Sequence, residues 1–317
     1  MVAELGWLAI PFSEEQGGLG GGHTDLSLIF EEFGKAIVVE PYLANVVLAG
    51  GVLKRSNLEN ADELIAGIVS GETQISLANY EPMKGFNLDN VDTTISSDGQ
   101  INGTKSTVLN AGNADHFLVF GKSGDGYAFG LVNRSSDGVK VVNYKTYDGF
   151  VSGDLVLENC KCDAVFSAEN ALEIIEETIL DAIVCVSSEA VGAMEKSYKL
   201  TIEYTQQREQ FGQSLSKFQA LQHRMVDMFM EYEQSVSMTY MVNMKLDEDA
   251  AARAKAAAGA KVQIGKSGRF VGQQAVQLHG GMGMTDDMPI GHFFKRLTMI
   301  DAIFGNVDFH RKRFAQI

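Results

Sequence analysis

The hydrophobic pattern of this chain changes its period twice, and this change limits the folds that the chain can adopt. Between residues 26 and 71, apolar side chains recur at helical spacing. Between residues 72 and 168 the period is two, and β-rich runs are separated by Asp-Gly, Asn-Gly and Ser-Gly turns. From residue 169 to residue 317 the pattern is helical again. This order predicts an α+β fold, because the alternating βαβ units of a parallel α/β sheet are missing.

The three segments predict three domains. We expect an N-terminal helical domain over residues 1–71, a middle antiparallel β domain over residues 72–168 and a C-terminal helical domain over residues 169–317. The chain has 317 residues, of which 45% are hydrophobic, and only four prolines. It can therefore bury a large core, and the segregated order of its elements disfavours a Rossmann fold.

Composition excludes several classes of function. The formal net charge of −15 and the lack of a long Lys/Arg run argue against a nucleic-acid partner, which needs clustered cations. No run of about 18 apolar residues predicts a membrane span, and no signal peptide opens the chain, so we expect a cytoplasmic protein. The three cysteines, Cys160, Cys162 and Cys185, have no ligand cluster around them. We therefore expect reduced structural thiols and no metal site.

A first candidate binding motif lies in residues 204–224, where a helix, a Phe211-Gly212 break, a short turn and a second helix follow one another. Arg208 falls near the end of the first helix, where it could complement the helix dipole. Its planar fork is also well matched to a pyrophosphate, and Gln219, just inside the second helix, could add amide donors. Spacing alone favours the structural interpretation.

A second candidate motif is the glycine-rich segment that follows Gln277. Gly280, Gly281 and Gly283 end a long predicted helix, and Gln277 lies on the last turn of that helix. Such glycines allow a ligand to approach the backbone closely, but they also serve as an ordinary helix C-cap. A glycine-rich loop by itself is weak evidence for a nucleotide.

The two motifs together resemble a known family. The pattern R-x-Q-F-G-x(5)-F-Q-A-x-Q-H, followed further along by Q-L-H-G-G-x-G-x-T, is similar to the C-terminal domain of the acyl-CoA dehydrogenase family. The segments 4–11, 15–20 and 31–34 near the N-terminus also resemble that family. The resemblance covers nearly the whole chain and is most specific between residues 180 and 300.

The resemblance implies an N-terminal helical domain, a middle β domain and a C-terminal four-helix bundle. It also implies FAD-dependent α,β-dehydrogenation of an acyl-CoA thioester, with an electron-transfer flavoprotein as electron acceptor. In this family two subunits share each FAD, because residues of one subunit reach over to the flavin of its neighbour. The positions that carry this role here are Arg208, Phe211, Gln219, Gln277, Gly280 and Gly281.

The catalytic base of the family has no clean match in this chain. The reaction needs a carboxylate to remove the α-proton of the substrate. Where many members have Tyr-Glu-Gly-Thr, residues 303–306 read Ile-Phe-Gly-Asn, and Phe304 cannot accept a proton. Other members place the base at a position that falls on Ala182. Asp181, next to it, and Glu189, two helical turns further on, are candidates, with a packing or solvated carboxylate as the alternative account, so the base stays unknown.

The β segment departs from the family as well. Residues 79–82 read Asn-Tyr-Glu-Pro and residues 106–110 read Ser-Thr-Val-Leu-Asn, where the family has threonine donors and a tryptophan against the flavin ring. The chain's own flavin-ring site is therefore in doubt, while its contribution to a neighbour's FAD is intact. Family members also begin with some tens of residues before the position that is Glu4 here, so we expect a truncated start.

These departures predict a heteromeric enzyme. The segments 291–297 and 304–310 look like subunits of bacterial α2β2 acyl-CoA dehydrogenases, which act on bulky CoA thioesters that include steroid side chains. In such a dimer of dimers, a second acyl-CoA dehydrogenase subunit would supply the base. Two alternatives stay open: a self-sufficient homotetramer whose base is Asp181, Glu189 or another acid, and a non-catalytic scaffold of the same fold.

Overall fold

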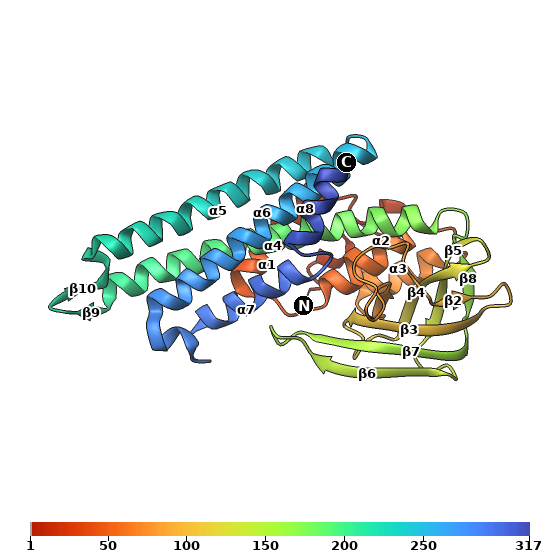
Figure 1. Cartoon of the computed structure of the whole chain (residues 1–317). Helices are drawn as coiled ribbons and strands as arrows, with labels where there is room; N and C mark the ends of the chain where they lie inside the picture. Colours follow the sequence, from red (N-terminus) through yellow and green to blue (C-terminus); the bar gives the residue numbers. More distant parts are fainter. Residues whose placement is uncertain (1) are drawn as a thin grey trace. The chain divides into compact units, whose positions relative to one another are not determined.

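The computed structural model describes residues 2–317 and divides into two compact units (Figure 1). The first unit holds the chain up to Gly22 together with Val39–Ala182, and the second holds His23–Val38 together with Ile183–Ile317. The first unit contains short helices and a sheet, and the second contains long helices. The predicted α+β class is confirmed. The division into three domains at residues 71 and 168 stays a prediction, because each unit collects elements from separate stretches of chain.

The helical part of the first unit is short and irregular. Asn45 anchors it to the sheet, because its side-chain amide donates to the Thr73 carbonyl at 3.1 Å and its oxygen accepts from the Ile75 N–H at 2.8 Å. The elements are η1 (Trp7–Ala9), η2 (Glu14–Gln16), the π-helical η3 (Leu43–Ala49), α2 (Gly50–Leu53) and α3 (Ala61–Ser70).

The sheet of the first unit confirms the predicted β segment. Its strands run in the order β6-β7-β3-β2-β4-β5-β8, and every neighbouring pair is antiparallel except β2 and β4. The first strand lies off this path and pairs in parallel with β4. The strands are β1 (Ile75–Ala78), β2 (Thr94–Ile95), β3 (Gln100–Leu109), β4 (His116–Ser123), β5 (Gly126–Asn133), β6 (Val139–Lys145), β7 (Val151–Lys161) and β8 (Ala164–Phe166).

A buried ion pair ties the sheet to the loop before it. The Lys105 Nζ lies 2.8 Å from the Glu81 Oε1, and both side chains are buried. Glu81 also accepts the backbone N–H groups of Asp92 and Thr93 at 2.6 and 2.9 Å. Burial alone favours the neutral carboxyl, but the bonds from Lys105 and Thr93 outweigh it and lower the pKa of Glu81 to about 2. The loop that carries residues 79–82 is therefore held from two sides.

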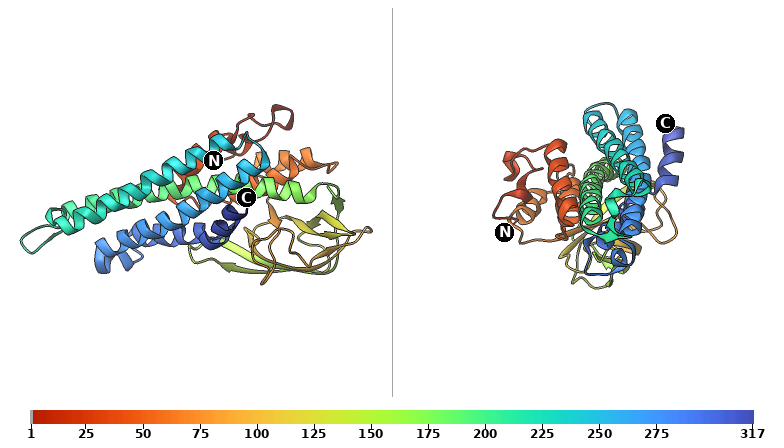
Figure 2. Two further views of the ribbon diagram at one scale, coloured as in Figure 1. Left: turned by 45° about the horizontal axis from the view of Figure 1, so that its top comes forward. Right: turned by 90° about the vertical axis from the view of Figure 1, so that its left-hand side faces the viewer.

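The second unit is a bundle of long helices, and the predicted C-terminal helical domain is confirmed there. Helix α6 contacts α5, α7 and α8, and α5 and α6 run side by side in both views of Figure 2. The first residues of α4, up to Ala182, belong to the first unit. The elements are α1 (His23–Ala36), α4 (Ala171–Gln207), β9 (Glu209–Gln210), β10 (Gln213–Ser214), η4 (Leu215–Lys217), α5 (Gln219–Lys245), α6 (Ala250–His279), η5 (Gly280–Met284), α7 (Pro289–Ala302) and α8 (Val307–Gln316).

Helix ends in this unit follow from local sequence. Asp249 caps α6 by accepting the N–H of Ala252, and Asn306 caps α8 by accepting the N–H of Phe309. Helix α7 opens with a proline, which lacks the N–H that a first turn leaves unsatisfied. These residues set the positions at which the helices begin and the preceding loops end.

Two glycines allow α1 and α4 to touch through their backbones. A Cβ on Gly34 would lie 1.9 Å from the Glu189 carbonyl oxygen, and a Cβ on Gly192 would lie 1.9 Å from the Glu31 carbonyl oxygen. Any other residue would push the helices apart. Helix α1 therefore packs in the second unit, although its neighbours along the chain belong to the first.

Residues 2–317 lack two kinds of feature. No helix in that range is both long and apolar enough to cross a membrane. The same residues contain no group of three or more His, Cys, Asp or Glu side chains that could hold a metal ion. Cys160, Cys162 and Cys185 are buried.

Candidate functional site

Phe211 stands at the tip of a tight hairpin in the second unit. Strands β9 and β10 pair Gln210 with Gln213, which leaves Phe211 and Gly212 as a two-residue turn. Both turn residues have positive φ, 55° and 80°, as a type I′ turn requires. This backbone is unfavourable for a bulky side chain by roughly 1–2 kcal/mol. Phe211 is nevertheless 90% exposed, so its edge-on contact with Phe218 leaves most of the side chain open to a group outside the chain.

Arg208 links helix α4 to this hairpin and leaves its guanidinium free. Its backbone N–H donates to the Tyr204 carbonyl, and its carbonyl accepts from the Leu215 N–H, each at 2.8 Å. The side chain is exposed and, within residues 2–317, forms no hydrogen bond or ion pair. An arginine that served only to cap α4 would bond the last helix carbonyls. Its five donors are therefore open to a ligand.

A ring stack brings the end of α4 to the end of α6. The rings of Tyr204 and His279 lie 4.3 Å apart at 22°, and the Tyr204 hydroxyl donates to the His279 carbonyl at 3.4 Å. Arg208 follows Tyr204 by one helical turn, and Gly280 follows His279 directly. The hairpin and the glycine-rich loop, separate in sequence, therefore lie at the same end of the bundle (Figure 1).

Different physical constraints act on the three glycines of the loop. Gly280 has φ 59° and ψ −141°, a conformation that essentially only glycine adopts. A Cβ on Gly283 would lie 2.7 Å from the Val276 carbonyl oxygen, so packing requires this glycine. A Cβ on Gly281 would meet nothing within 4 Å. Gly281 therefore leaves its backbone open toward a group outside the chain.

Two glutamines complete the exposed set. Gln219 opens α5 and Gln277 lies on the last turn of α6, and neither side-chain amide is hydrogen-bonded within the described part of the chain. Phe218, next to Gln219, packs edge-on against Phe211 with ring centroids 6.1 Å apart. The structure thus exposes every residue that the sequence predicts to hold FAD, namely Arg208, Phe211, Gln219, Gln277, Gly280 and Gly281.

These residues fit a diphosphate-bearing cofactor such as FAD. The unpaired guanidinium of Arg208 and the free amides of Gln219 and Gln277 are donors, which a pyrophosphate and a ribose can accept. Gly281 gives access to backbone, and Phe211 offers an exposed ring. The fit rests on unsatisfied donors in this chain, and the assignment of each contact stays a prediction.

Both candidate bases are buried and paired with an arginine. In the first unit, the Asp181 Oδ2 is 2.7 Å from the Arg55 Nη2. In the second unit, the Arg296 fork holds both oxygens of Glu189 at 2.5 and 2.8 Å, and both side chains are buried. A general base must reach the proton that it takes from a substrate. Carboxylates that are clamped by arginines do not meet this requirement, so neither residue is supported as the base.

The turn between α7 and α8, where the family often places its base, carries a buried phenylalanine instead. Phe304 is buried and has φ 56°. The buried ammonium of Lys261 donates to the carbonyls of Ile300 and Ile303, and His310 Nε2 lies 2.9 Å from the Phe304 carbonyl oxygen. Sequence reasoning overlooked Lys261, although it is a cation on an Ala-rich face that is otherwise apolar. The buried side chains of Lys261 and His310 therefore hold this turn in place. Phe304, at the position where the family often has its base, cannot accept a proton.

The turn makes a pH-dependent contribution to stability. Burial lowers the pKa of His310 from 6.5 to about 4, although the hydrogen bond to the Phe304 carbonyl acts in the opposite direction and raises the pKa. Because the folded pKa is the lower one, the contribution is present above pH 6.5 and is lost as the pH falls toward 4. We expect wild-type protein to lose about 3 kcal/mol more unfolding free energy than His310→Gln between pH 7 and pH 4. Urea unfolding at several pH values measures the difference. His223→Gln, which removes an exposed histidine, is the control for the substitution itself. An equal loss of unfolding free energy between pH 7 and pH 4 in wild type and His310→Gln would contradict the assignment.

Segment 106–110, which departs from the family's flavin-ring contacts in sequence, is hydrogen-bonded within the chain. Strand β3 has an irregularity between Lys105 and Val108, and Thr107 there has φ 53°. The Thr107 N–H donates to the Asp154 Oδ1 at 3.1 Å, and the Tyr144 hydroxyl donates to the same oxygen at 2.9 Å. Hydrogen bonds within the chain therefore satisfy this strained segment, and the absence of a flavin-ring site of its own stays a prediction.

Two family models match most of the chain. Residues 172–317 match the model of the acyl-CoA dehydrogenase C-terminal domain, and residues 1–72 match the model of the N-terminal domain. The chain is 24% identical to the mitochondrial short-chain specific acyl-CoA dehydrogenase of Mus musculus, over 98% of this chain and 79% of that protein.

Solved structures share the fold over nearly the full length of the chain. One is a variant of the Tcur3481-Tcur3483 steroid ACAD, with a TM-score of 0.90, 26% identity and coverage of 99% of this chain and 86% of that one. Another is the ChsE4-ChsE5 complex from Mycobacterium tuberculosis, with a TM-score of 0.90, 24% identity and coverage of 99% and 85%.

Proposed function

This chain belongs to the acyl-CoA dehydrogenase family, and from that membership we propose that it works as one subunit of a hetero-oligomeric acyl-CoA dehydrogenase. As a family member it is an oxidoreductase that acts on acyl-CoA thioesters and uses FAD. Bound FAD supplies the acceptor for the hydride that leaves the β-carbon of the substrate. An electron-transfer flavoprotein as the next acceptor and a cytoplasmic location are further parts of this proposal.

The observation that carries the proposal is the set of open groups at one end of the bundle. Arg208, Gln219 and Gln277 present donors that have no partner in the described chain, and Phe211 presents an exposed ring on a strained turn. A subunit that only packed against others would have no physical need for this combination. We propose that these residues, with Gly280 and Gly281, contact the FAD of a neighbouring subunit.

The missing base argues for a partner that is different from this chain. Phe304 cannot take a proton, and the carboxylates of Asp181 and Glu189 are clamped by Arg55 and Arg296. In a homotetramer every subunit would lack an accessible carboxylate at these positions. We propose that the partner supplies the base, and the names of the ChsE4-ChsE5 and Tcur3481-Tcur3483 structures are compatible with an assembly of two different chains.

An apolar face on α5 offers a surface for a partner. Five large apolar side chains on this helix are between 44% and 72% exposed, which is unusual for one face of a surface helix. They recur at helical spacing, and their burial in an assembly would remove apolar area from water. The residues are Val226, Phe229, Met230, Tyr240 and Met244.

Absorption spectroscopy tests the proposal. We would purify the chain alone and after co-expression with the product of its neighbouring gene, and compare the flavin band and the mass of the assembly. We expect flavin, and its bleaching by an acyl-CoA, only in the co-expressed complex. A flavin-loaded, active homomer would favour the self-sufficient enzyme, and a flavin-free complex would favour the scaffold.

A further inference from the structure

Tyr204 is bonded to both of the segments that carry the predicted cofactor residues. Its carbonyl accepts the Arg208 N–H at 2.8 Å, which fixes the residue that leads into the hairpin. Its hydroxyl donates to the His279 carbonyl at 3.4 Å, and its ring stacks on the His279 ring with centroids 4.3 Å apart. Gly280 follows His279 directly. One residue of α4 therefore contacts the backbone that leads into each segment.

His279 gives this stack a fixed partner. Its side chain is 3% exposed, and its Nδ1 lies 2.8 Å from the Ala275 carbonyl oxygen. Because a carbonyl oxygen only accepts, Nδ1 is the donor, and Nε2 has no partner within residues 2–317. Burial lowers the pKa of His279, so the ring is neutral at pH 7. A neutral ring can stack on a tyrosine without leaving a buried charge unpaired.

The glycine-rich loop needs a contact from outside its own helix. The last carbonyls of a helix have no partner within that helix, and the Tyr204 hydroxyl bonds one of them, at His279. Beyond it, a Cβ on Gly280 or Gly281 would meet nothing within 4 Å, so no neighbouring side chain or backbone packs closely against that side of the two residues. Glycine also has more backbone freedom to lose than any other residue when a ligand orders it. The contact from Tyr204 therefore restricts the part of the loop nearest to these glycines.

The next residue on α4 makes the corresponding contact with α5. Thr205 is fully buried, and its hydroxyl lies 3.3 Å from the Met225 Sδ on α5 and 2.9 Å from the Ile202 carbonyl. Helix α5 begins at Gln219. The last turn of α4 therefore contacts α6 through Tyr204 and α5 through Thr205, and these are the two helices that carry the glutamines of the cofactor set.

We propose that Tyr204 is a positioning residue of the shared flavin site, which holds Gly280 and Gly281 at a fixed distance from Arg208 before FAD binds. The inference rests on the proposed function, because it assumes that one flavin contacts both segments. A ligand that contacts two segments binds more tightly when their separation is already set, since less order has to be created on binding. The ring and the hydroxyl of Tyr204 are engaged by His279, so Tyr204 acts through its neighbours.

The first test is titration of the flavin-free, co-expressed complex with FAD. Tyr204→Leu removes the stack and the hydroxyl, and it should weaken FAD binding roughly tenfold, because the loop must then be ordered on binding. Tyr204→Phe keeps the stack and loses one long hydrogen bond, so it should stay within about threefold of wild type. This rescue by the conservative variant separates the ring stack from the hydroxyl.

Tyr198→Leu is the matched control for a loss of packing. It removes another half-buried tyrosine from α4, whose ring lies 5.2 Å from the Tyr232 ring on α5 and is not in contact with the ring of His279. It should lower the melting temperature of the complex, as Tyr204→Leu does, and leave the FAD affinity of the folded complex unchanged. A purely structural role for Tyr204 would give both variants the same affinity.

Two further readouts are specific to positioning. In a double-mutant cycle, Arg208→Gln should weaken FAD binding less in Tyr204→Leu than in wild type, because the distance between the segments matters only when both contact the flavin. Hydrogen exchange in the flavin-free complex needs no ligand. Tyr204→Leu should speed the exchange of residues 280–284 and leave β4 of the first unit unchanged.

The outcomes distinguish this inference from the proposed function. If Arg208→Gln weakens FAD binding and Tyr204→Leu does not, the inference is overturned and the proposed function stands. If neither variant weakens binding, both are overturned. Equal loss of affinity in Tyr198→Leu and Tyr204→Leu, or unchanged exchange of residues 280–284, would overturn the positioning role alone.

Discussion

Arg208→Gln is expected to weaken the binding of FAD by the assembled complex about 10- to 100-fold. A hydrogen bond to a charged group contributes about 1.5–3 kcal/mol, and each 1.4 kcal/mol is a factor of ten in affinity. The guanidinium has no partner in the described chain, so its loss should cost nothing within the subunit. The variant should therefore keep the melting temperature of the flavin-free protein and lose the flavin.

The measurement is a titration of flavin-free complex with FAD, followed by the quenching of flavin fluorescence. Lys196→Gln gives a matched control, because it removes an exposed, unpaired cation from the same helix about 18 Å before Arg208. It should leave the affinity unchanged. If Arg208→Gln retained wild-type affinity, Arg208 would have no role at the cofactor, and the shared flavin site would lose its main support.

Arg296→Met is expected to reduce the unfolding free energy of the protein by about 3–5 kcal/mol. The variant would leave the carboxylate of Glu189 buried without the fork that now holds both of its oxygens at 2.5 and 2.8 Å. A buried charge that loses its partner carries the full penalty of removal from water. Urea unfolding at pH 7 would show this as a lower midpoint at an unchanged slope.

The double variant Glu189→Leu with Arg296→Met separates the charge from the packing. It removes both partners and should recover most of the lost stability, because a buried pair and an apolar pair of similar volume differ little in free energy. A single variant as stable as wild type would mean that water reaches Glu189. That result would return Glu189 to consideration as a proton acceptor.

Local pattern in the sequence determined the class of the fold and the family. The hydrophobic period depends only on which neighbouring side chains share a face, so it predicts helices and strands before any tertiary contact is known. The motifs around Arg208 and Gly280 are short and linear, so they too can be recognised from the sequence. The structure confirms the α+β order and exposes all six predicted cofactor residues.

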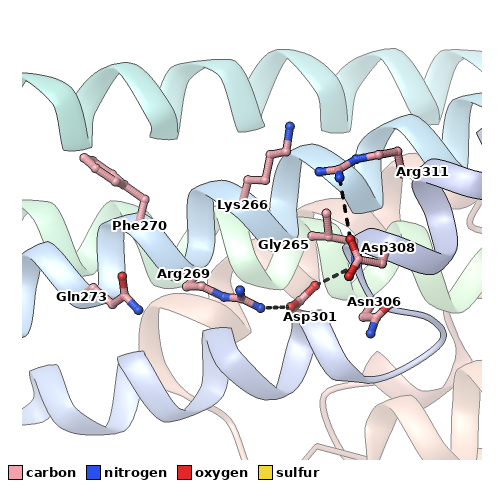
Figure 3. Close-up of a pocket in the computed structure, with 10 residues that line it drawn as sticks. Gly265, Lys266, Arg269, Phe270, Gln273, Asp301, Asn306, Asp308 and Arg311 are labelled. Atoms are coloured by element: carbon pink, nitrogen blue, oxygen red, sulfur yellow. Dashed lines mark hydrogen bonds and ion pairs between the residues drawn. The ribbon is translucent and has the colours of Figure 1, made fainter.

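Only the tertiary structure decided what surrounds each candidate residue. Asp181 and Glu189 are plausible bases in the sequence, but their arginine partners lie 126 and 107 residues away. The difference between Gly281 and Gly283 depends on what lies within 4 Å of each backbone. Likewise, a cavity lined by Lys266 of α6 and Arg311 of α8 exists because these two helices pack together (Figure 3). These are through-space contacts between distant segments, and they depend on how whole helices pack rather than on the spacing of residues along the chain.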